Sequence, residues 1–433
     1  MRPISVENVD RDLRALCVDI GPRLAGTPAE AHAADYLARE FAAAGAAVTI
    51  ETFPVQERHV TGENLEIVLD GEWRPFPCSL LSNTPGTDGR DIEAPVVFFD
   101  SNTEYQRPDL SFLRGKAVIH LGTHIESRDA YRRLMEARPA FILIVDVRYP
   151  GTVPLADGMF PAYTRALGAV PVMNVAYMDA WQWKVAGASA ARLRVMGGMR
   201  ASTSQNVIAE FAGSDPAAGI VFAGGHHDTQ AACPGADDNA TGSCGLVELA
   251  RALADVPRRR ALRLISFGAE EQLSVGSAVY VRRHRDEIES RGRLMFNLDG
   301  YGSHLGWTNL TCNGPDGLAG FLAPFFTRRG QWVRIISDMV PYADHFPFVA
   351  AGVPAAWLGR ENCTAGRFFH HRPDDDMSRV SVPLVASLLG SVAEALATAV
   401  SAEPLPFPIR MGAGTAAAAE QMWEDLFGGW KDA

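Results

Sequence analysis

From residue 204 onward, short apolar runs alternate with amphipathic segments, and this alternation constrains the fold more than any other feature. It predicts strands joined by helices, and therefore an α/β fold whose mostly parallel mixed sheet is covered by helices on both faces. The predicted strands are 206–211, 219–224, 261–267, 293–298, 332–337 and 354–358. The predicted helices are 241–254, 275–289, 316–328, 345–351 and 382–401.

The segment between residues 59 and 203 has a different texture. Short β-branched runs alternate there with Gly, Pro and Asp turns, and helical spacing is clear only near 127–137. Before it, residues 6–18 and 28–44 carry helical apolar spacing. The prediction is a catalytic domain split between two segments, an inserted mainly-β domain, and a C-terminal arm. These parts are 1–58 with 204–402, then 59–203, and finally 403–433.

Composition restricts the partners. Apolar residues make up 47% and charged residues 21%, which is typical of a globular enzyme rather than a disordered chain. The net charge of −11 argues against nucleic acid and anionic membrane surfaces, so a peptide or a similar small substrate is expected. A homo-oligomer is possible. The first residues form no apolar signal segment, which favours a cytoplasmic protein; trimming of a longer chain would leave secretion open.

Polar residues that can carry chemistry follow the predicted strands. In an open α/β sheet, sites form beyond the carboxyl ends of the strands, so these side chains should converge. They are His226, His227, Asp228, Asp237, Asp238, Glu270, Glu271, Asp299, His370 and His371. Mixed imidazole and carboxylate groups are ligands for a divalent ion such as Zn²⁺. The sequence has no G-x-S-x-G nucleophile elbow that would indicate a serine hydrolase.

The local spacing suggests how the roles divide. In His226-x-Asp228, the aspartate can accept the second ring N–H and fix the tautomer of the histidine. The adjacent Glu270 and Glu271 cannot point the same way, so one can bind metal while the other faces an attacking water. A carboxylate next to that water can act as a general base, because zinc lowers the pKa of bound water to roughly 7.

Six motifs occur in order along residues 204–400: GGHHDT, PGADDNATG, SFGAEEQLSVGS, FNLDGYG, ADHFPFVAAGVPA and FHHRPDDDM. Together they resemble the co-catalytic zinc aminopeptidases and carboxypeptidases of the M28 type. Residues 59–203, with LRGKAVIHLGT and ALGAVPVMNV, look like the protease-associated domain that several members carry as an insertion. The resemblance implies two zinc ions per chain, about 3.5–4 Å apart, which hold the attacking hydroxide and polarise the scissile carbonyl.

The resemblance also assigns roles to residues. The zinc ligands would be His226, Asp238, Glu271, Asp299 and His371. His226 and Glu271 would each bind one ion, and Asp238 would bridge both. Glu270 would be the general base, and Asp228 would orient His226.

Several polar neighbours of these residues are expected not to bind metal. The family pattern selects His226 and His371, so His227 and His370 are interpreted as non-ligands. Asp237 is expected to be a hydrogen-bonding partner. Asp344-His345 is expected to begin a helix and shape the pocket.

A second group of residues is assigned to substrate binding. Tyr342 lies near the motifs and could support the oxyanion. Arg360 and Arg367, with Arg372, could hold a substrate carboxylate, because the guanidinium fork suits that geometry. Phe369 could line an apolar pocket.

The sequence therefore predicts a dinuclear zinc exopeptidase that hydrolyses the N-terminal peptide bond, with Glu270 activating the bridging water. Three alternatives remain. The same metal site could serve a carboxypeptidase or dipeptidase; a mono-zinc acyltransferase similar to glutaminyl cyclase could use this sheet; or the chain could be a metal-free receptor or scaffold.

Overall fold

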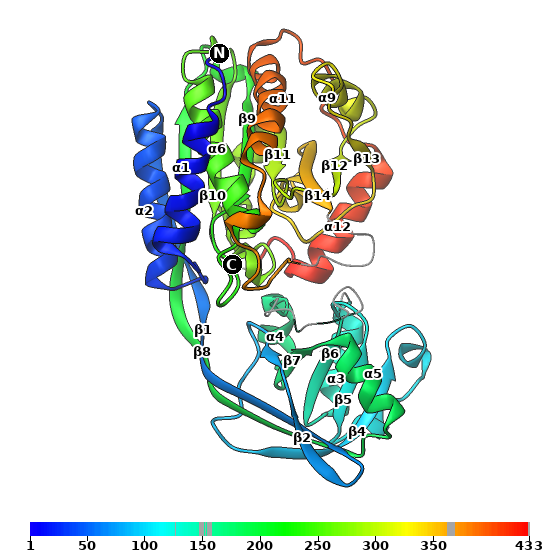
Figure 1. Cartoon of the computed structure of the whole chain (residues 1–433). Helices are drawn as coiled ribbons and strands as arrows, with labels where there is room; N and C mark the ends of the chain where they lie inside the picture. The colour runs from blue at the N-terminus through cyan, green and yellow to red at the C-terminus, as the bar shows by residue number, and fades with distance from the viewer. Residues whose placement is uncertain (126, 147–150, 152, 154–157, 362–368, 432–433) are drawn as a thin grey trace.

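The computed structural model describes residues 1–125, 127–146, 151, 153, 158–361 and 369–431. Two bodies joined by a long ribbon are visible (Figure 1). The strands are β1 (Ala47–Leu69), β2 (Glu72–Phe76), β3 (Ser79–Leu80), β4 (Ile92–Asp100), β5 (Ala117–Leu121), β6 (Phe141–Val145), β7 (Val172–Val175), β8 (Ala190–Phe211), β9 (Ile220–His226), β10 (Ala261–Phe267), β11 (Gly292–Leu298), β12 (Trp307–Asn313), β13 (Arg334–Ile336) and β14 (Ala355–Glu361).

The helices of the N-terminal and middle parts of the chain are α1 (Val6–Arg14), α2 (Pro28–Ala43), α3 (Arg128–Ala137), α4 (Pro161–Leu167), α5 (Tyr177–Val185) and α6 (Thr241–Leu253). Those that follow are α7 (Val275–Arg283), α8 (Arg285–Arg291), α9 (Leu318–Thr327), α10 (Phe346–Ala350), α11 (Val382–Ser401) and α12 (Ala413–Phe427).

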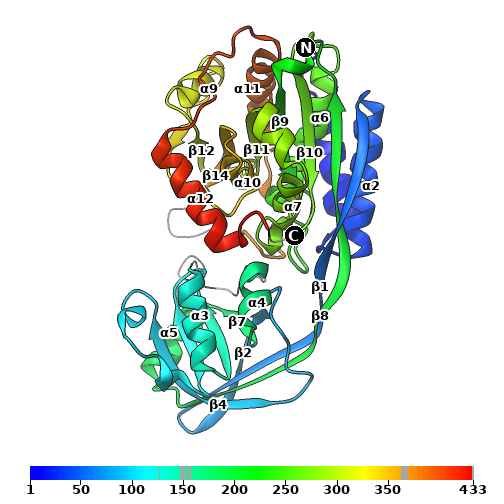
Figure 2. The same cartoon turned by 180° about the vertical axis from the view of Figure 1, so that it is seen from behind.

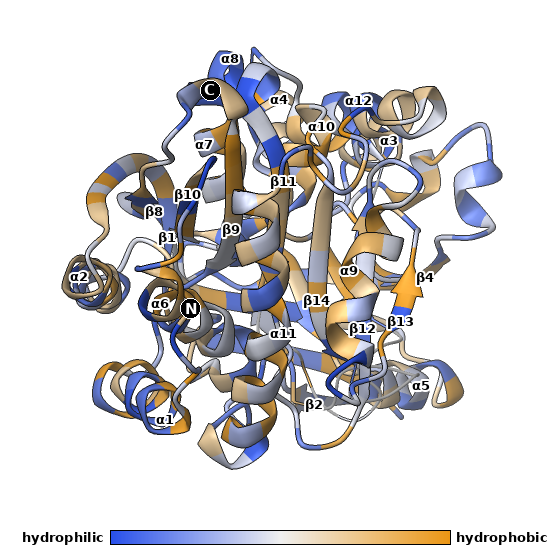
Figure 3. Ribbon diagram, turned by 90° about the horizontal axis from the view of Figure 1, so that it is seen from above, coloured by the Kyte–Doolittle hydropathy of each residue, from blue (hydrophilic) through white to orange (hydrophobic). Residues whose placement is uncertain are grey.

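The larger body is built on strands in the order β13-β12-β14-β11-β9-β10-β8. The central strands β9, β10, β11 and β14 are parallel, whereas β8 and β12 run antiparallel to their neighbours β10 and β14. The expected α/β fold with a mostly parallel mixed sheet is thus confirmed. Alternate residues of β9 enter different cores: Val221 packs with α6 and α11, and Phe222 packs with α7 and α10. Figure 3 shows β9 in hydrophobic colours between these layers.

The ribbon consists of β1 and β8, which pair antiparallel from Ala47 opposite Glu210 to Ile67 opposite Ala191. At one end β8 pairs with β10, and at the other it pairs with β4. The smaller body continues from there as β4, β5, β6 and β7, which are mutually parallel (Figure 2). The predicted boundaries after residues 58 and 203 therefore fall inside continuous strands. The domain division, and the likeness of 59–203 to a protease-associated domain, stay predictions.

Several elements differ from the sequence-based expectation. The helix predicted over 275–289 is divided into α7 and α8, because His284 between them leaves the helical region (φ −107°, ψ 21°). Strand β12 was missed because its sequence WTNLTCN is largely polar. In the smaller body α4 and α5 were also missed. Among the described helices, α11 is long and apolar enough to cross a membrane, but it packs into the core of the larger body.

The C-terminal arm forms α12, which packs between the two bodies against α10 and α4. Its Trp423 is completely buried, and Phe427 stacks on Phe346 with ring centroids 5.5 Å apart. One face of α12 is therefore part of the core.

Replacing Trp423 by Ala is expected to lower the free energy of unfolding by about 3–5 kcal/mol, because a fully buried indole leaves a large cavity. Trp181, 57% exposed on α5, is the matched control, and its replacement by Ala should change the free energy by less than about 0.5 kcal/mol. Urea unfolding followed by circular dichroism measures both. Equal effects of the two substitutions would contradict the packing described for α12.

Candidate active site

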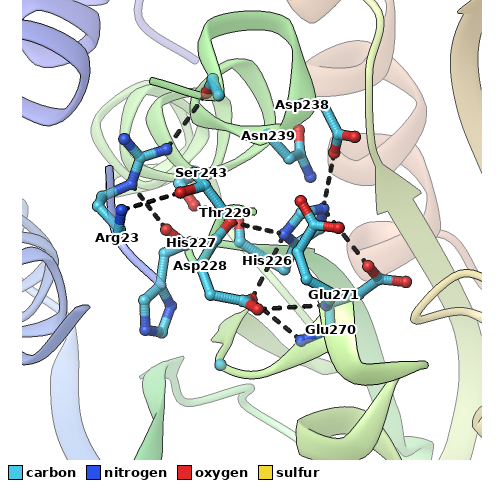
Figure 4. Close-up of polar contacts among 12 residues, drawn as sticks. Arg23, His226, His227, Asp228, Thr229, Asp238, Asn239, Ser243, Glu270 and Glu271 are labelled. Carbon is cyan, nitrogen blue, oxygen red and sulfur yellow. Dashed lines mark hydrogen bonds and ion pairs between the residues drawn. The ribbon is translucent and has the colours of Figure 1, made fainter. Parts of the chain in front are cut away.

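The structure gathers the predicted residues at the carboxyl ends of three parallel strands. His226 is the last residue of β9, and Asp228 follows it; Glu270 and Glu271 come after β10, and Asp299 comes directly after β11. Figure 4 shows the side chains of the first four pointing toward one another. All five are buried or nearly so, so the site is a desolvated edge of the sheet.

His226 lies at the centre of this group. Its Nε2 is 3.1 Å from Asp238 Oδ1 and 3.8 Å from Glu270 Oε2 (Figure 4). It is also 3.6 Å from Asp299 Oδ1. Burial disfavours a charged imidazole, but the neighbouring carboxylates, Glu270 foremost, raise the pKa of His226 well above its usual range. One imidazole thus faces three acidic side chains from three separate loops.

Asp228 touches both His226 and the glutamate loop. His226 Nδ1 lies 3.1 Å from the carbonyl oxygen of Asp228 and 3.5 Å from its carboxylate Oδ1. The two carboxylate oxygens accept hydrogen bonds from the backbone amides of Glu270 (3.0 Å) and Glu271 (3.2 Å). Asp228 therefore lies beside His226, and it also fixes the backbone that carries both glutamates.

The second half of the site contains His370 and His371, whose rings stack 3.5 Å apart. His371 Nε2 lies 2.8 Å from Glu271 Oε2 and 3.4 Å from Asp238 Oδ2. His370 Nε2 lies 2.9 Å from the same oxygen of Asp238. His370, interpreted from the sequence as a non-ligand, is therefore inside the cluster, and Asp238 lies between the two halves.

The donor set fits divalent metal. The side chains form two groups, and within each group the ligand atoms all lie within 4.8 Å of one another. One group is His226 with Asp238 and Asp299, and the other is Asp238 with His370 and His371. Glu271 Oε1 is buried without a hydrogen-bond partner among the described residues. Four carboxylates buried this close together repel one another unless a cation or protons compensate their charge. Imidazole and carboxylate ligands are those that zinc prefers.

The pKa values reflect this crowding. Burial raises the pKa of Glu270 well above its usual range and that of Glu271 to about 7. Burial would also raise the pKa of Asp238, but the adjacent His370 and His226 imidazoles hold it well below its usual range. The carboxylates of one site therefore differ in the protonation state that they favour.

Some of the polar neighbours point away from the cluster. The Nδ1 of His227 lies 3.0 Å from Ser266 Oγ on β10, and burial lowers the pKa of this histidine to about 4. His345 Nε2 contacts the Asn313 side chain at 3.0 Å, so it too faces another element. Asp344 lies near the site, where burial raises its pKa to about 7.

Two adjoining cavities open onto the cluster. A central cavity of about 170 Å³ is lined by Glu270, Glu271 and Tyr342, among others. A side cavity of about 270 Å³ is lined by Arg360 and Phe369, among others. Both are bordered by Asp238, Asp299, Val340, Trp357 and His370. Arg367, the remaining residue predicted to bind substrate, lies outside the described residues.

Comparison with known proteins points to one peptidase family. Residues 206–396 match the model of peptidase family M28. The chain carries an M28 peptidase domain. It is 26% identical over 437 residues to aminopeptidase YwaD of Bacillus subtilis, a match that covers 98% of this chain and 91% of that protein. The M28 resemblance seen in the motifs is thereby confirmed.

Solved structures share the fold over nearly the whole length. An aminopeptidase from an Aneurinibacillus strain superposes with a TM-score of 0.74 at 24% identity, covering 94% of this chain and 97% of that one. A zinc aminopeptidase from Bacillus subtilis gives 0.70 at 22% identity, covering 94% and 98%. An M28 peptidase precursor from Shewanella amazonensis gives 0.75 at 21% identity, covering 93% and 96%. The shared fold therefore extends beyond the M28 domain into the smaller body.

Sequence reasoning missed two residues that hold the loops of the M28 domain. Arg23 is completely buried, and it donates to the carbonyl oxygens of His227 (2.8 Å), Pro234 (2.8 Å) and Gly235 (3.2 Å) (Figure 4). It also donates to two carbonyl oxygens closer in sequence, both at 3.0 Å. It thus ties the loop after β9 to the loop that carries Asp238. Its role could not be predicted, because the partners that join the two loops are backbone atoms far away in sequence.

Asp375 is the second missed residue. Its carboxylate accepts hydrogen bonds from the backbone amides of Asp237 (2.9 Å) and Asp238 (3.0 Å). It is the middle residue of the acidic run 374–376. The segment 369–376 therefore positions Asp238 as well as supplying His371.

Replacing Arg23 by Lys is expected to weaken zinc binding by about 10- to 100-fold, because one ammonium group cannot bond the carbonyls of both loops. Competition with a chromogenic chelator measures the affinity. Arg260 is the matched control, since it is also buried and donates to the carbonyls of Ala399 and Ala402, remote from the site. Zinc affinity that drops equally in both variants would contradict a specific role for Arg23.

Proposed function

We propose that the chain is a dinuclear zinc exopeptidase that removes residues from the N-terminus of peptides. The observation that carries the proposal is the convergence of three histidines and four carboxylates, Asp238 among them, in one buried cluster. The M28 domain supports the same reaction class. So does the name of the Bacillus subtilis relative, an aminopeptidase.

The residues suggest how two ions would be held. His226, Asp238 and Asp299 would hold one zinc, and Asp238, Glu271 and His371 would hold the other, which agrees with the contacts among these side chains. When bound, zinc would lower the pKa of an attacking water and polarise the scissile carbonyl. Asp238 would serve both ions, because its two oxygens face the two halves of the site.

Glu270 is the proposed general base. Its Oε1 accepts a hydrogen bond from Ser274 Oγ (3.1 Å), while Oε2 faces His226 at 3.8 Å, so one oxygen is anchored and the other points into the cluster. In the proposed reaction this carboxylate takes a proton from the attacking water and delivers it to the nitrogen of the leaving amine. Asp228 would keep Glu270 in place through the backbone amide of that residue.

Two features favour an aminopeptidase over a carboxypeptidase. The carboxylates that border the cavities can attract the free ammonium group of a peptide. Arg360, which could hold a substrate carboxylate, already donates to Ser303 O and Thr308 Oγ1, both at 2.7 Å. The donors of this guanidinium are therefore partly committed to the protein itself.

Substituting Glu270 by Gln should lower kcat on peptides with a free N-terminus by about 10²- to 10⁴-fold, because the amide cannot accept the proton. The variant should retain its zinc, which a metal assay on the same sample checks. Peptides with an acetylated N-terminus serve as the substrate control and should not be cleaved by either protein. A Glu270→Gln variant as fast as the parent would rule out the proposed base.

The metal content gives an independent test. Plasma emission on the fully active protein should find two zinc ions per chain, and dialysis against a chelator should abolish hydrolysis and lower the melting temperature, because metal binds the folded state. Adding zinc back should restore both. One zinc per chain in a fully active sample would exclude the dinuclear site.

A further inference from the structure

The carboxyl ends of β9, β10 and β11 face the smaller body across the molecule (Figures 1 and 2). The central cavity lies at this junction, where Glu270, Glu271 and Tyr342 form part of its wall. His124, from the loop after β5, lines the same cavity. Among its described lining residues, His124 is the one supplied by the segment between β1 and β8.

His124 is held in a defined position. Its ring packs on that of Tyr342 with centroids 5.2 Å apart and an interplanar angle of 31°. The next residue, Ile125, is only 3% exposed and belongs to a core cluster that includes Leu273 and Phe346 of the larger body. The backbone beside the imidazole is thus anchored in a core shared by both bodies.

The smaller body itself is fixed against the site. The backbone amide of Arg128, at the start of α3, donates to Asp425 Oδ1 of α12 at 3.2 Å. Phe160 packs edge-on against Phe427 with centroids 5.9 Å apart. A Cβ at Gly158 would lie 3.0 Å from the Cα of Gln272, the residue after the glutamate pair. These contacts keep the loop that carries His124 next to the reacting groups.

The two cavities indicate which part of a peptide would meet His124. Both share Asp238 and Asp299, whereas Glu270 and His124 border only the central cavity. In the proposed reaction Glu270 delivers a proton to the leaving amine, so the leaving segment would lie in the central cavity, which Glu270 borders. His124 borders that cavity too.

We propose that His124 binds the substrate beyond the scissile bond, donating a ring N–H to the carbonyl or carboxylate oxygen of the residue that follows the bond. The inserted segment thereby completes the substrate site of the larger body. The inference rests on the proposed aminopeptidase function. Its rival is a purely structural role, in which His124 does no more than pack on Tyr342.

The substitution His124→Phe separates these roles, since phenylalanine keeps a ring against Tyr342 but loses the N–H. Two substrates are compared: a leucyl dipeptide, which has a carboxylate after the scissile bond, and leucyl 4-nitroanilide, which has neither a carbonyl nor a carboxylate there. We expect kcat/KM to fall about tenfold for the dipeptide, in keeping with one lost hydrogen bond to a charged group. The loss should be at least about five times smaller for the anilide, which offers His124 no such oxygen.

Two further variants sharpen the comparison. His124→Gln retains an N–H donor and should recover part of the dipeptide rate. His59→Phe, at an exposed position on the ribbon, is the control and should leave both rates as in the parent. Equal losses on the two substrates, or no loss on either, would overturn the inference while leaving the aminopeptidase proposal intact. A parent protein that cleaves neither substrate would overturn both.

Discussion

The concentration of buried negative charge around Asp238 is the constraint on which the site depends. Carboxylates from separate loops approach one imidazole within 3.8 Å, in a place from which water is largely excluded. Such an arrangement persists only if the surrounding chain holds each group firmly. Backbone amides donate hydrogen bonds to Asp228, and Asp375 accepts one from the backbone amide of Asp238. Arg23 joins the loop after β9 to the loop that carries Asp238. The side chains of Asp228, Asp375 and Arg23, none of them a proposed metal ligand, thus hold the loops of the site in place.

Much of the fold of the larger body could be predicted because its central strands are buried on both sides. A continuous apolar run such as 220–224 predicts a buried strand when helical segments flank it. The helix predicted over 382–401 has the same bounds as α11. The prediction failed where burial is partial. Strand β12 is half polar, and the break at His284 depends on local backbone geometry that apolar spacing does not report.

The candidate site shows a similar division. Residues directly after parallel strands, such as Asp299, could be placed because the topology brings strand ends together. The inclusion of His370 could not be predicted, because no local pattern shows that the rings of both His370 and His371 face Asp238. Arg23 and His124 were missed for a different reason. Both act across large sequence separations, one through backbone carbonyls and the other from a separate body, so no local pattern predicts their roles.

The β1–β8 ribbon carries a consequence for how such a chain could have arisen. Because its two strands are paired in register, the points where the chain leaves and re-enters the larger body are neighbours, for instance Val55 opposite Ser202. A short turn joining them would give an ordinary hairpin at the edge of the catalytic sheet. The whole intervening segment could therefore be gained or lost by a genetic event without reordering one strand of the sheet. An ancestor without the segment and a descendant with it would differ in the residues that contact the substrate, while sharing the same proposed metal ligands.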